Sequence, residues 1–196
     1  PDDRAAYGIE DQFLVGNAIL VAPVLERRSR ARRVYFPAGS GWYDLVTGTR
    51  YEGGGWVEIA APLERSPVFL RAGAVIPTQP VVQHTGEAVE VITLEVLPGG
   101  EVESFLYQDA GDRPLEPYRR VHFHQGGGAT LRMEPSGSFA APHRQLRARF
   151  WDVDPPARVE VDGAPVEWQY DAERRQAVVE LTPPVASTSV HIVPKP

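Results

Sequence analysis

Residues 11–26 read DQFLVGNAILVAPVLE, and they contain the first long apolar run of the chain. The centre of this run, residues 18–22, is apolar at every position, whereas most later runs alternate polar and apolar residues. Gly16 and Pro23 bound it, and about seven residues between two such breakers is the length of a strand rather than of a helix. A strand with two apolar faces is expected to be buried on both sides.

The segments on either side of this strand differ in character. Before it, Asp2 and Asp3 precede Arg4–Tyr7 and predict an N-cap followed by one or two helical turns. After it, short alternating runs are separated by glycine-rich and proline-rich turns about every eight to twelve residues, which is typical of antiparallel β-sandwiches. Strands are expected at 33–37, 42–44, 56–59, 68–72, 74–77, 90–97, 102–107, 118–124, 129–134, 145–151, 158–161, 176–181 and 188–193.

Two turns and one linker follow from this pattern. The runs 90–97 and 102–107 are expected to pair across Pro98–Gly100, and Asp162–Gly163 predicts a tight hairpin turn of the primed type. The polar stretch 78–87 separates two groups of strands. The expected organisation is an N-terminal segment at 1–17, a first sandwich at 18–80, a linker at 81–87 and a second sandwich at 88–196.

The composition excludes several classes of function. A net charge of −6 argues against binding to nucleic acid, which needs a basic face. The basic cluster Arg27–Arg33 lies between two strand-like runs and indicates a solvated loop, with anion binding as the alternative. The chain has no cysteine, so disulfides and thiolate metal sites are excluded. No apolar run reaches the ~18–20 residues of a membrane span, and no residue pattern calls for a cofactor.

Two groups of polar residues are candidates for catalysis or metal binding. Asp109 and Asp112 predict a β-turn, because Asp side chains bond the local backbone; a calcium loop and a glycosidase acid/base pair are the alternatives. His122 and His124 would share one face of a strand, but no third metal ligand has suitable spacing. No catalytic residue is therefore assigned, and Asp109 and Asp112 remain weak metal candidates.

Aromatic residues offer a candidate sugar-binding surface. Trp42, Tyr43 and Trp56, with Tyr51 nearby, could form a platform for sugar rings or could supply core and interdomain packing. Packing is the favoured interpretation. Trp42, Tyr43 and Trp56 remain the weak candidates for substrate binding.

An ordered set of motifs resembles the C-terminal part of glycoside hydrolase family 31, the α-glucosidase and α-xylosidase family. The motifs occur in the family's order and lie at residues 11–16, 20–24, 34–37, 41–44, 47–48, 61–63, 67–73, 76–77 and 105–112. From about residue 115 onward the match rests on strand pattern. Gln108 and Ala110 depart from the family, which usually carries acids at these two positions of its acidic turn.

The resemblance implies a fold and a division of labour. It implies an all-β chain with two consecutive antiparallel β-sandwiches, preceded at 1–17 by a short helical and strand remnant of a (β/α)8 barrel. In that family two aspartates of the barrel carry out retaining hydrolysis, and no residue of this chain aligns with either motif. The implied partners are thus the catalytic barrel of a parent chain and, through it, a carbohydrate substrate.

The expected function is therefore the non-catalytic C-terminal region of a family 31 α-glycosidase, which braces the barrel that cleaves α-glucosides or α-xylosides. A free-standing carbohydrate-binding module is the alternative, and a structural sandwich is a third possibility. The chain is expected to be incomplete, because it begins at Pro1 without an initiator methionine. A soluble, cytoplasmic location is favoured, without a sequence signal that determines it.

Overall fold

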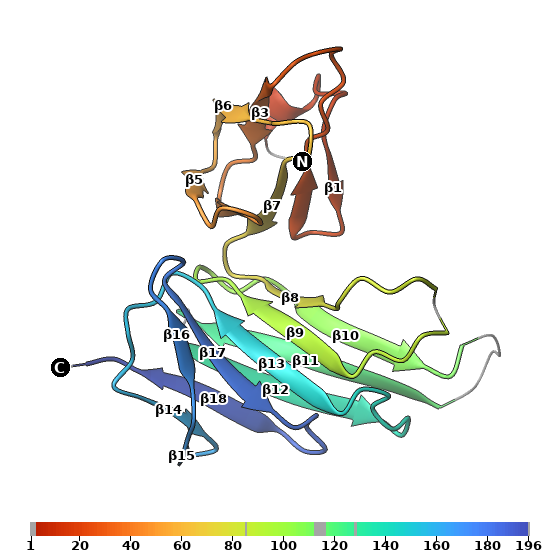
Figure 1. The fold of residues 1–196 in the computed structure, drawn as a ribbon, viewed down its shortest axis with the longest axis vertical. Helices are drawn as coiled ribbons and strands as arrows, with labels where there is room; N and C mark the ends of the chain where they lie inside the picture. The colour runs from red at the N-terminus through yellow and green to blue at the C-terminus, as the bar shows by residue number, and fades with distance from the viewer. Residues whose placement is uncertain (1–2, 85, 112–116, 128, 196) are drawn as a thin grey trace. The chain divides into compact units, whose positions relative to one another are not determined.

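A computed structural model describes residues 3–84, 86–111, 117–127 and 129–195, and the chain divides into two compact units (Figure 1). The first unit is Pro1–Ala72 and the second is Gly73–Pro196. Apart from one 3-10 turn at Arg4–Ala6, the regular elements of the described residues are strands. The all-β fold class is thereby confirmed. No helix of the described residues is long and apolar enough to cross a membrane.

The first unit contains a five-stranded sheet in the order β1-β2-β7-β4-β5 and a two-stranded sheet of β3 and β6. Neighbouring strands in both sheets are antiparallel. Their bounds are β1 Phe13–Val15, β2 Ile19–Val21, β3 Ala31–Phe36, β4 Gly41–Asp44, β5 Arg50–Glu52, β6 Gly55–Ala60 and β7 Val68–Arg71.

Large side chains from both sheets form the core of the first unit. Phe36 stacks on Tyr51 with ring centroids 4.9 Å apart, and it meets Phe69 edge to face at 4.8 Å. Such pairs stabilise a core beyond the apolar area that they bury. The remaining members of the cluster are Leu20, Ala22, Val34, Trp42 and Ile59.

The start of the chain belongs to this first unit. Residues 13–15 form β1, which pairs with β2 in a hairpin whose turn contains Gly16 at φ 62°. In the apolar run Leu20 is buried, whereas Ile19 and Val21 are half-buried, so its second face is only partly covered. The barrel-remnant interpretation of 1–17 remains a prediction.

Asp3 precedes the 3-10 turn as expected, but its side chain does not cap it. The carboxylate instead accepts hydrogen bonds from the Tyr35 hydroxyl at 2.9 Å and from the Ala38 backbone N–H at 3.0 Å. These bonds, with Ala38 as the larger contribution, lower the pKa of Asp3. The acidic residue therefore ties the N-terminal segment to β3 rather than stabilising a helix.

The second unit is a two-layered sandwich (Figure 1). One sheet has the order β10-β11-β12-β18-β14-β15 and the other β16-β17-β13-β9-β8. Buried side chains from both sheets, including Leu94, Phe123, Leu131 and Phe150, fill the space between them. The bounds are β8 Val75–Thr78, β9 Val91–Val96, β10 Ser104–Asp109, β11 Tyr118–Gly126, β12 Thr130–Gly137, β13 Gln145–Phe150, β14 Arg158–Val161, β15 Ala164–Val166, β16 Gln169–Asp171, β17 Gln176–Leu181 and β18 Thr188–Val193.

Two features of the second unit differ from the sequence expectation. The runs expected to pair across Pro98–Gly100 lie in different sheets, β9 in one and β10 in the other. In addition, β9 pairs in parallel with β13, while the other strand pairs are antiparallel. The chain changes sheets after β9 because Leu97 donates its N–H to Ala74 O at 3.0 Å, and Val102 donates to Gly73 O at 3.2 Å.

The boundary between the two units also differs from the expected one. The compact units divide between Ala72 and Gly73, ahead of the expected linker at 81–87. Strand β8 then belongs to the second unit, because Val75 pairs with Val96 of β9 in antiparallel register. The hairpin at Asp162–Gly163 is confirmed: both residues have positive φ, 49° and 81°, as a type I′ turn requires.

Candidate functional site: the surface of the first unit

The three aromatic candidates for sugar binding do not form one platform. Trp42 and Tyr43, on β4, are each 2% exposed, whereas Trp56, on β6, is 43% exposed. The Trp42 indole lies in the core and donates to Pro37 O at 3.3 Å. Trp42 and Tyr43 therefore offer no ring face to a ligand, and packing accounts for both of them.

Trp56 is the centre of a surface cluster on β3 and β6. It lies opposite Tyr35 in the strand register, with ring centroids 5.4 Å apart. The Arg33 guanidinium lies over the indole, with Cζ 5.2 Å from the ring centroid. Beside them is a hollow of about 350 Å³ whose lining includes Asp11 and Glu58. An aromatic face with flanking charges is a surface suited to a polar partner.

The described part of the acidic turn in the second unit, Asp109 to Gly111, is held by a local hydrogen bond. Asp109 Oδ1 accepts a hydrogen bond from the Gly111 N–H at 3.0 Å, as in an Asx turn. Desolvation and then the neighbouring Asp109 carboxylate raise the pKa of Tyr107. Asp112 lies outside the described residues. Within the described part of the chain, no group of three or more His, Cys, Asp or Glu residues could hold a metal ion.

His124 is engaged with carboxylates on the surface of the second unit. Its Nδ1 lies 2.7 Å from Glu101 Oε1, and its Nε2 lies 3.5 Å from Glu134 Oε2. His122 shares the same face of β11, opposite Glu134. Both histidine side chains lie on the outer face of the sheet.

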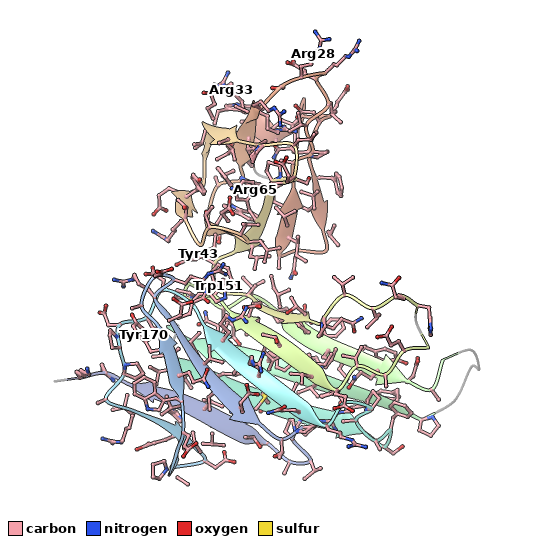
Figure 2. The ribbon with its side chains drawn as sticks, in the orientation of Figure 1. Arg28, Arg33, Tyr43, Arg65, Trp151 and Tyr170 are labelled. Carbon is pink, nitrogen blue, oxygen red and sulfur yellow. The ribbon has the colours of Figure 1, made fainter. Side chains whose placement is uncertain are left out.

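A buried aspartate explains the Gly-Trp-Tyr-Asp motif of the first unit. Asp44 Oδ1 accepts hydrogen bonds from the N–H groups of Val46 and Thr47, both at 2.9 Å, which fixes the turn after β4. Its other oxygen forms a salt bridge with Arg65, whose side chain points into the unit (Figure 2). Burial and then Asp44 raise the pKa of Tyr51. The motif is therefore structural, because its one carboxylate is occupied by local bonds.

The basic cluster Arg27–Arg33 is only partly a solvated loop. Arg28 has a φ of 65° and points away from the first unit (Figure 2). Arg32 instead donates to Pro23 O at 2.5 Å and to Asp11 O at 2.7 Å, and its Nη2 lies 3.0 Å from Asp11 Oδ2. The expectation of a solvated loop holds for Arg28, while Arg32 joins the start of the chain to β3.

An apolar edge of the first unit is its most unusual surface. Phe13, Leu14 and Val15 of β1 are 54%, 47% and 51% exposed, and β1 lies at the edge of its sheet. Most of the exposed large hydrophobic side chains among the described residues belong to this smaller unit; besides β1 they are Tyr7, Leu25, Leu45, Val46, Trp56 and Leu63. Clustered apolar exposure marks an interaction surface.

Strand β1 is held in place by Gln12, the residue that precedes it. The Gln12 side chain donates from Nε2 to Tyr35 O at 2.7 Å and accepts from the Tyr35 N–H at 2.9 Å through Oε1. The amide thus pairs with the backbone of β3 as a neighbouring strand would. No periodic pattern in the sequence signals this contact, although Gln12 stands within the first family motif.

Comparison with known proteins defines the class. Residues 1–76 match the glycosyl hydrolase family 31 C-terminal domain. An alpha-xylosidase of Saccharolobus solfataricus is 36% identical over 111 residues, covering 56% of this chain and 15% of that protein. The human neutral alpha-glucosidase AB is 30% identical over 189 residues, covering 88% of this chain and 20% of that protein.

Solved structures of the same class show the fold over nearly the whole chain. A family 31 dextranase of Flavobacterium johnsoniae, complexed with isomaltotriose, superposes with a TM-score of 0.84 over 98% of this chain at 24% identity, which covers 28% of that chain. The family 31 alpha-xylosidase of Xanthomonas citri superposes with a TM-score of 0.69 over 95% of this chain at 29% identity, covering 20% of that chain.

These matches confirm the resemblance seen in the sequence: the chain belongs to glycoside hydrolase family 31 and represents its C-terminal β-sandwich region. It spans no more than a fifth of the length of the two curated relatives described above.

Proposed function

We propose that this chain is the non-catalytic C-terminal region of a retaining α-glycosidase, and that its first unit braces the catalytic (β/α)8 barrel of the same polypeptide. The parent enzyme would cleave α-glucosides or α-xylosides, the activities that the names of the relatives carry. In the same proposal, residues 1–17 are the end of that barrel's chain. The 3-10 turn at Arg4–Ala6 is consistent with this origin.

The observation that carries the proposal is the exposed apolar strand β1. An edge strand with three half-exposed apolar side chains is unfavourable in water. Its unpaired backbone groups and its apolar area favour association with another protein surface. A docked domain would cover this area and stabilise both partners at roughly 25 cal/mol per Å² of apolar surface removed from water. Gln12 and Asp3 hold the strand and the turn before it against β3, so the surface is formed in advance.

The carboxylates of the chain support a non-catalytic role. Retaining glycosidases place two carboxyl groups about 5–5.5 Å apart across the scissile bond, and both must reach the substrate. The buried Asp44 and Glu95 are each engaged by local donors, Asp44 by a turn and Arg65, Glu95 by Trp151 and Arg149. Asp109 stabilises a turn by accepting a hydrogen bond from the backbone. Each of these three carboxylates stabilises the local structure through its hydrogen bonds or salt bridge, and this role accounts for its position.

The coding DNA on the 5′ side of the Pro1 codon tests the assignment to a larger enzyme. We expect an in-frame sequence that encodes a (β/α)8 barrel with the two catalytic aspartate motifs. A start codon at that point with no such frame would refute it.

The bracing role is tested in the full-length enzyme. Leu14→Asp places a charge in the proposed interface, and we expect a lower melting temperature and a several-fold loss of hydrolysis of nitrophenyl α-glucoside or α-xyloside. Val81→Asp, at an exposed position of the second unit, is the matched control. Equal behaviour of both variants and the unaltered enzyme would contradict the bracing role.

Exposure of Trp56 favours a second candidate function, that of a carbohydrate-binding module. In this case, titration of the chain with maltose, isomaltose or xylose would change its tryptophan fluorescence, and Trp56→Ala would remove the change. Fluorescence that stays constant at millimolar sugar would eliminate this candidate.

A further inference from the structure

In the second unit, the face of β10 and β11 that points away from the core carries three exposed aromatic side chains. Phe105, Tyr107 and Tyr118 are 45%, 48% and 46% exposed. Burial alternates along both strands, and the register places Tyr107 opposite Arg120 and Asp109 opposite Tyr118. The three rings therefore share one face of the sheet.

Contacts within the cluster fix the orientation of the rings. The rings of Tyr107 and Tyr118 are nearly parallel, with an interplanar angle of 14° and centroids 5.9 Å apart. Arg120 Cζ lies 4.9 Å from the Phe105 ring centroid and 5.9 Å from that of Tyr107. A cation held over two rings restrains both of them, so a ligand would lose little affinity to the ordering of side chains.

Polar groups surround the rings on the same face. The Asp109 carboxylate lies at one end of β10, and the register places Ser136 opposite Arg120 and Glu134 opposite His122. The rim thus offers carboxylate acceptors and hydroxyl, imidazole and guanidinium donors. Pyranose rings present C–H groups that pack on aromatic faces and hydroxyl groups that need both kinds of hydrogen-bond partner.

We propose that Phe105, Tyr107 and Tyr118 with Arg120, here called the β10–β11 aromatic face, form a binding site for a neutral α-linked glucan chain. The face would hold a length of substrate chain by stacking, without taking part in bond cleavage. The choice of α-linked glucose oligomers rests on the proposed function, while the site itself rests on the aromatic face.

The size and charge of the face favour a glycan over a macromolecular partner. A stable protein interface takes about 800 Å² and roughly 20–30 residues from each partner. The β10–β11 aromatic face has three rings, bordered by charged residues of both signs such as Arg132 and Glu134. Its area is far smaller than that of such an interface. Nucleic acid is disfavoured because the chain carries a net charge of −6. One or two sugar rings match the extent of the Tyr107–Tyr118 pair.

The test is a titration of the 196-residue chain with maltoheptaose and isomaltotriose, followed by calorimetry and by saturation-transfer NMR. We expect a dissociation constant of about 1 mM, the weak range of a small, open site. Tyr107→Ala and Tyr118→Ala are each expected to weaken binding about tenfold, whereas Tyr107→Phe keeps the ring and most of the affinity. Trp56→Ala, which removes the exposed indole of the first unit, is the matched control and should bind normally.

Each alternative outcome overturns the proposal. Absence of binding by the unaltered chain at about 10 mM sugar, 10-fold above the expected dissociation constant, would do so. So would unchanged affinity of Tyr107→Ala and Tyr118→Ala, provided that both variants retain the circular dichroism spectrum and melting temperature of the unaltered chain. Loss of binding in Trp56→Ala but not in Tyr107→Ala would place the sugar site on the first unit. Concentration-dependent dimerisation that Tyr107→Ala abolishes would identify the face as a protein interface. None of these outcomes bears on bracing of the barrel, which is measured in the full-length enzyme.

Discussion

The indole Nε1 of Trp151 donates a hydrogen bond of 2.8 Å to Oε2 of Glu95, a residue that is only 4% exposed. The other carboxylate oxygen lies 2.9 Å from Arg149 Nη1, and Arg149 stands opposite Glu95 in the parallel pair of β9 and β13. This carboxylate therefore joins the two strands by side-chain bonds in addition to the backbone ladder. A buried charge is tolerated there because both of its oxygens have donors.

Replacement of Glu95 by alanine is expected to lower the free energy of unfolding by about 3 kcal/mol, because it leaves the Trp151 and Arg149 donors without their acceptor. Urea unfolding followed by circular dichroism measures the change. Glu180→Ala removes an exposed pair with Arg147, which is 2.6 Å long, and should cost less than about 1 kcal/mol. Equal losses in the two variants would show that burial of Glu95 has no energetic consequence.

Gly73 cannot carry a side chain without displacing the backbone of the second unit. A Cβ atom at this position would lie 1.5 Å from Gly100 O, and the residue has a φ of 90°. Gly73→Ala is expected to cost at least about 3 kcal/mol or to prevent folding, because the close contact and the positive φ both oppose a side chain. The soluble yield and the melting temperature report the effect.

Gly100→Ala is the matched control, because nothing lies within 4 Å of a Cβ at Gly100. It should fold with nearly unchanged stability. Normal stability of Gly73→Ala would mean that residues 97–102 can move away without loss.

The strands were predictable because alternation of polar and apolar residues records which face of a sheet is buried. The runs 158–161, 176–181 and 188–193 coincide with β14, β17 and β18. The short strands β15 and β16 were not expected, since three residues such as Ala164–Val166 are too few to show a period.

The arrangement of β9 and β10 could not be predicted from the local sequence. Pro98–Gly100 carries a turn signal, and such a signal is the same whether the chain returns to its own sheet or passes to the opposite one. The choice depends on contacts of residues 97 and 102 with Gly73 and Ala74, which lie far away in the sequence. Long-range contacts of this kind leave no periodic pattern.

The candidate sites were only partly predictable for a similar reason. Trp42 and Trp56 both stand in strands of aromatic character, and only the strand partners decide that one is buried and the other exposed. A signal for the β10–β11 aromatic face was present, since Phe105 and Tyr107 alternate with Leu106 and Gln108. The sequence of β10 alone does not define this surface, because pairing with β11 is needed to bring Tyr118 and Arg120 beside these two rings.

Asp44 provides a test of what the Gly-Trp-Tyr-Asp motif does. Asp44→Ala removes the acceptor of the Val46 and Thr47 N–H groups and the partner of Arg65, so we expect a loss of about 3–5 kcal/mol. Asp44→Asn keeps an oxygen for the turn but loses the charge, and its loss should be smaller. Thermal and urea unfolding of the two variants separate the turn from the ion pair.

Glu52→Ala, which breaks the exposed pair with Arg50, is the control for Asp44 and should change stability by less than about 1 kcal/mol. If Asp44→Asn lost as much stability as Asp44→Ala, the ion pair with Arg65 would be the dominant contribution. If both variants were as stable as the control, the motif would have no structural role.

His143 is expected to make the stability of the second unit depend on pH. Burial, and then the Arg119 guanidinium, lowers the pKa of His143 below its ordinary value of 6.5, and Gln108 Nε2 lies 3.2 Å from its Nδ1. As the pH falls below 6.5, the unfolded chain binds a proton that the folded chain binds only at lower pH. The free energy of unfolding therefore decreases from pH 6.5 down to the lowered pKa, by at most about 1.4 kcal/mol per pH unit for one proton. Urea unfolding between pH 8 and pH 5 should show that His143→Gln reduces this slope, while His84→Gln, at an exposed position, retains it. A slope that is the same in all three proteins would exclude His143 as its source.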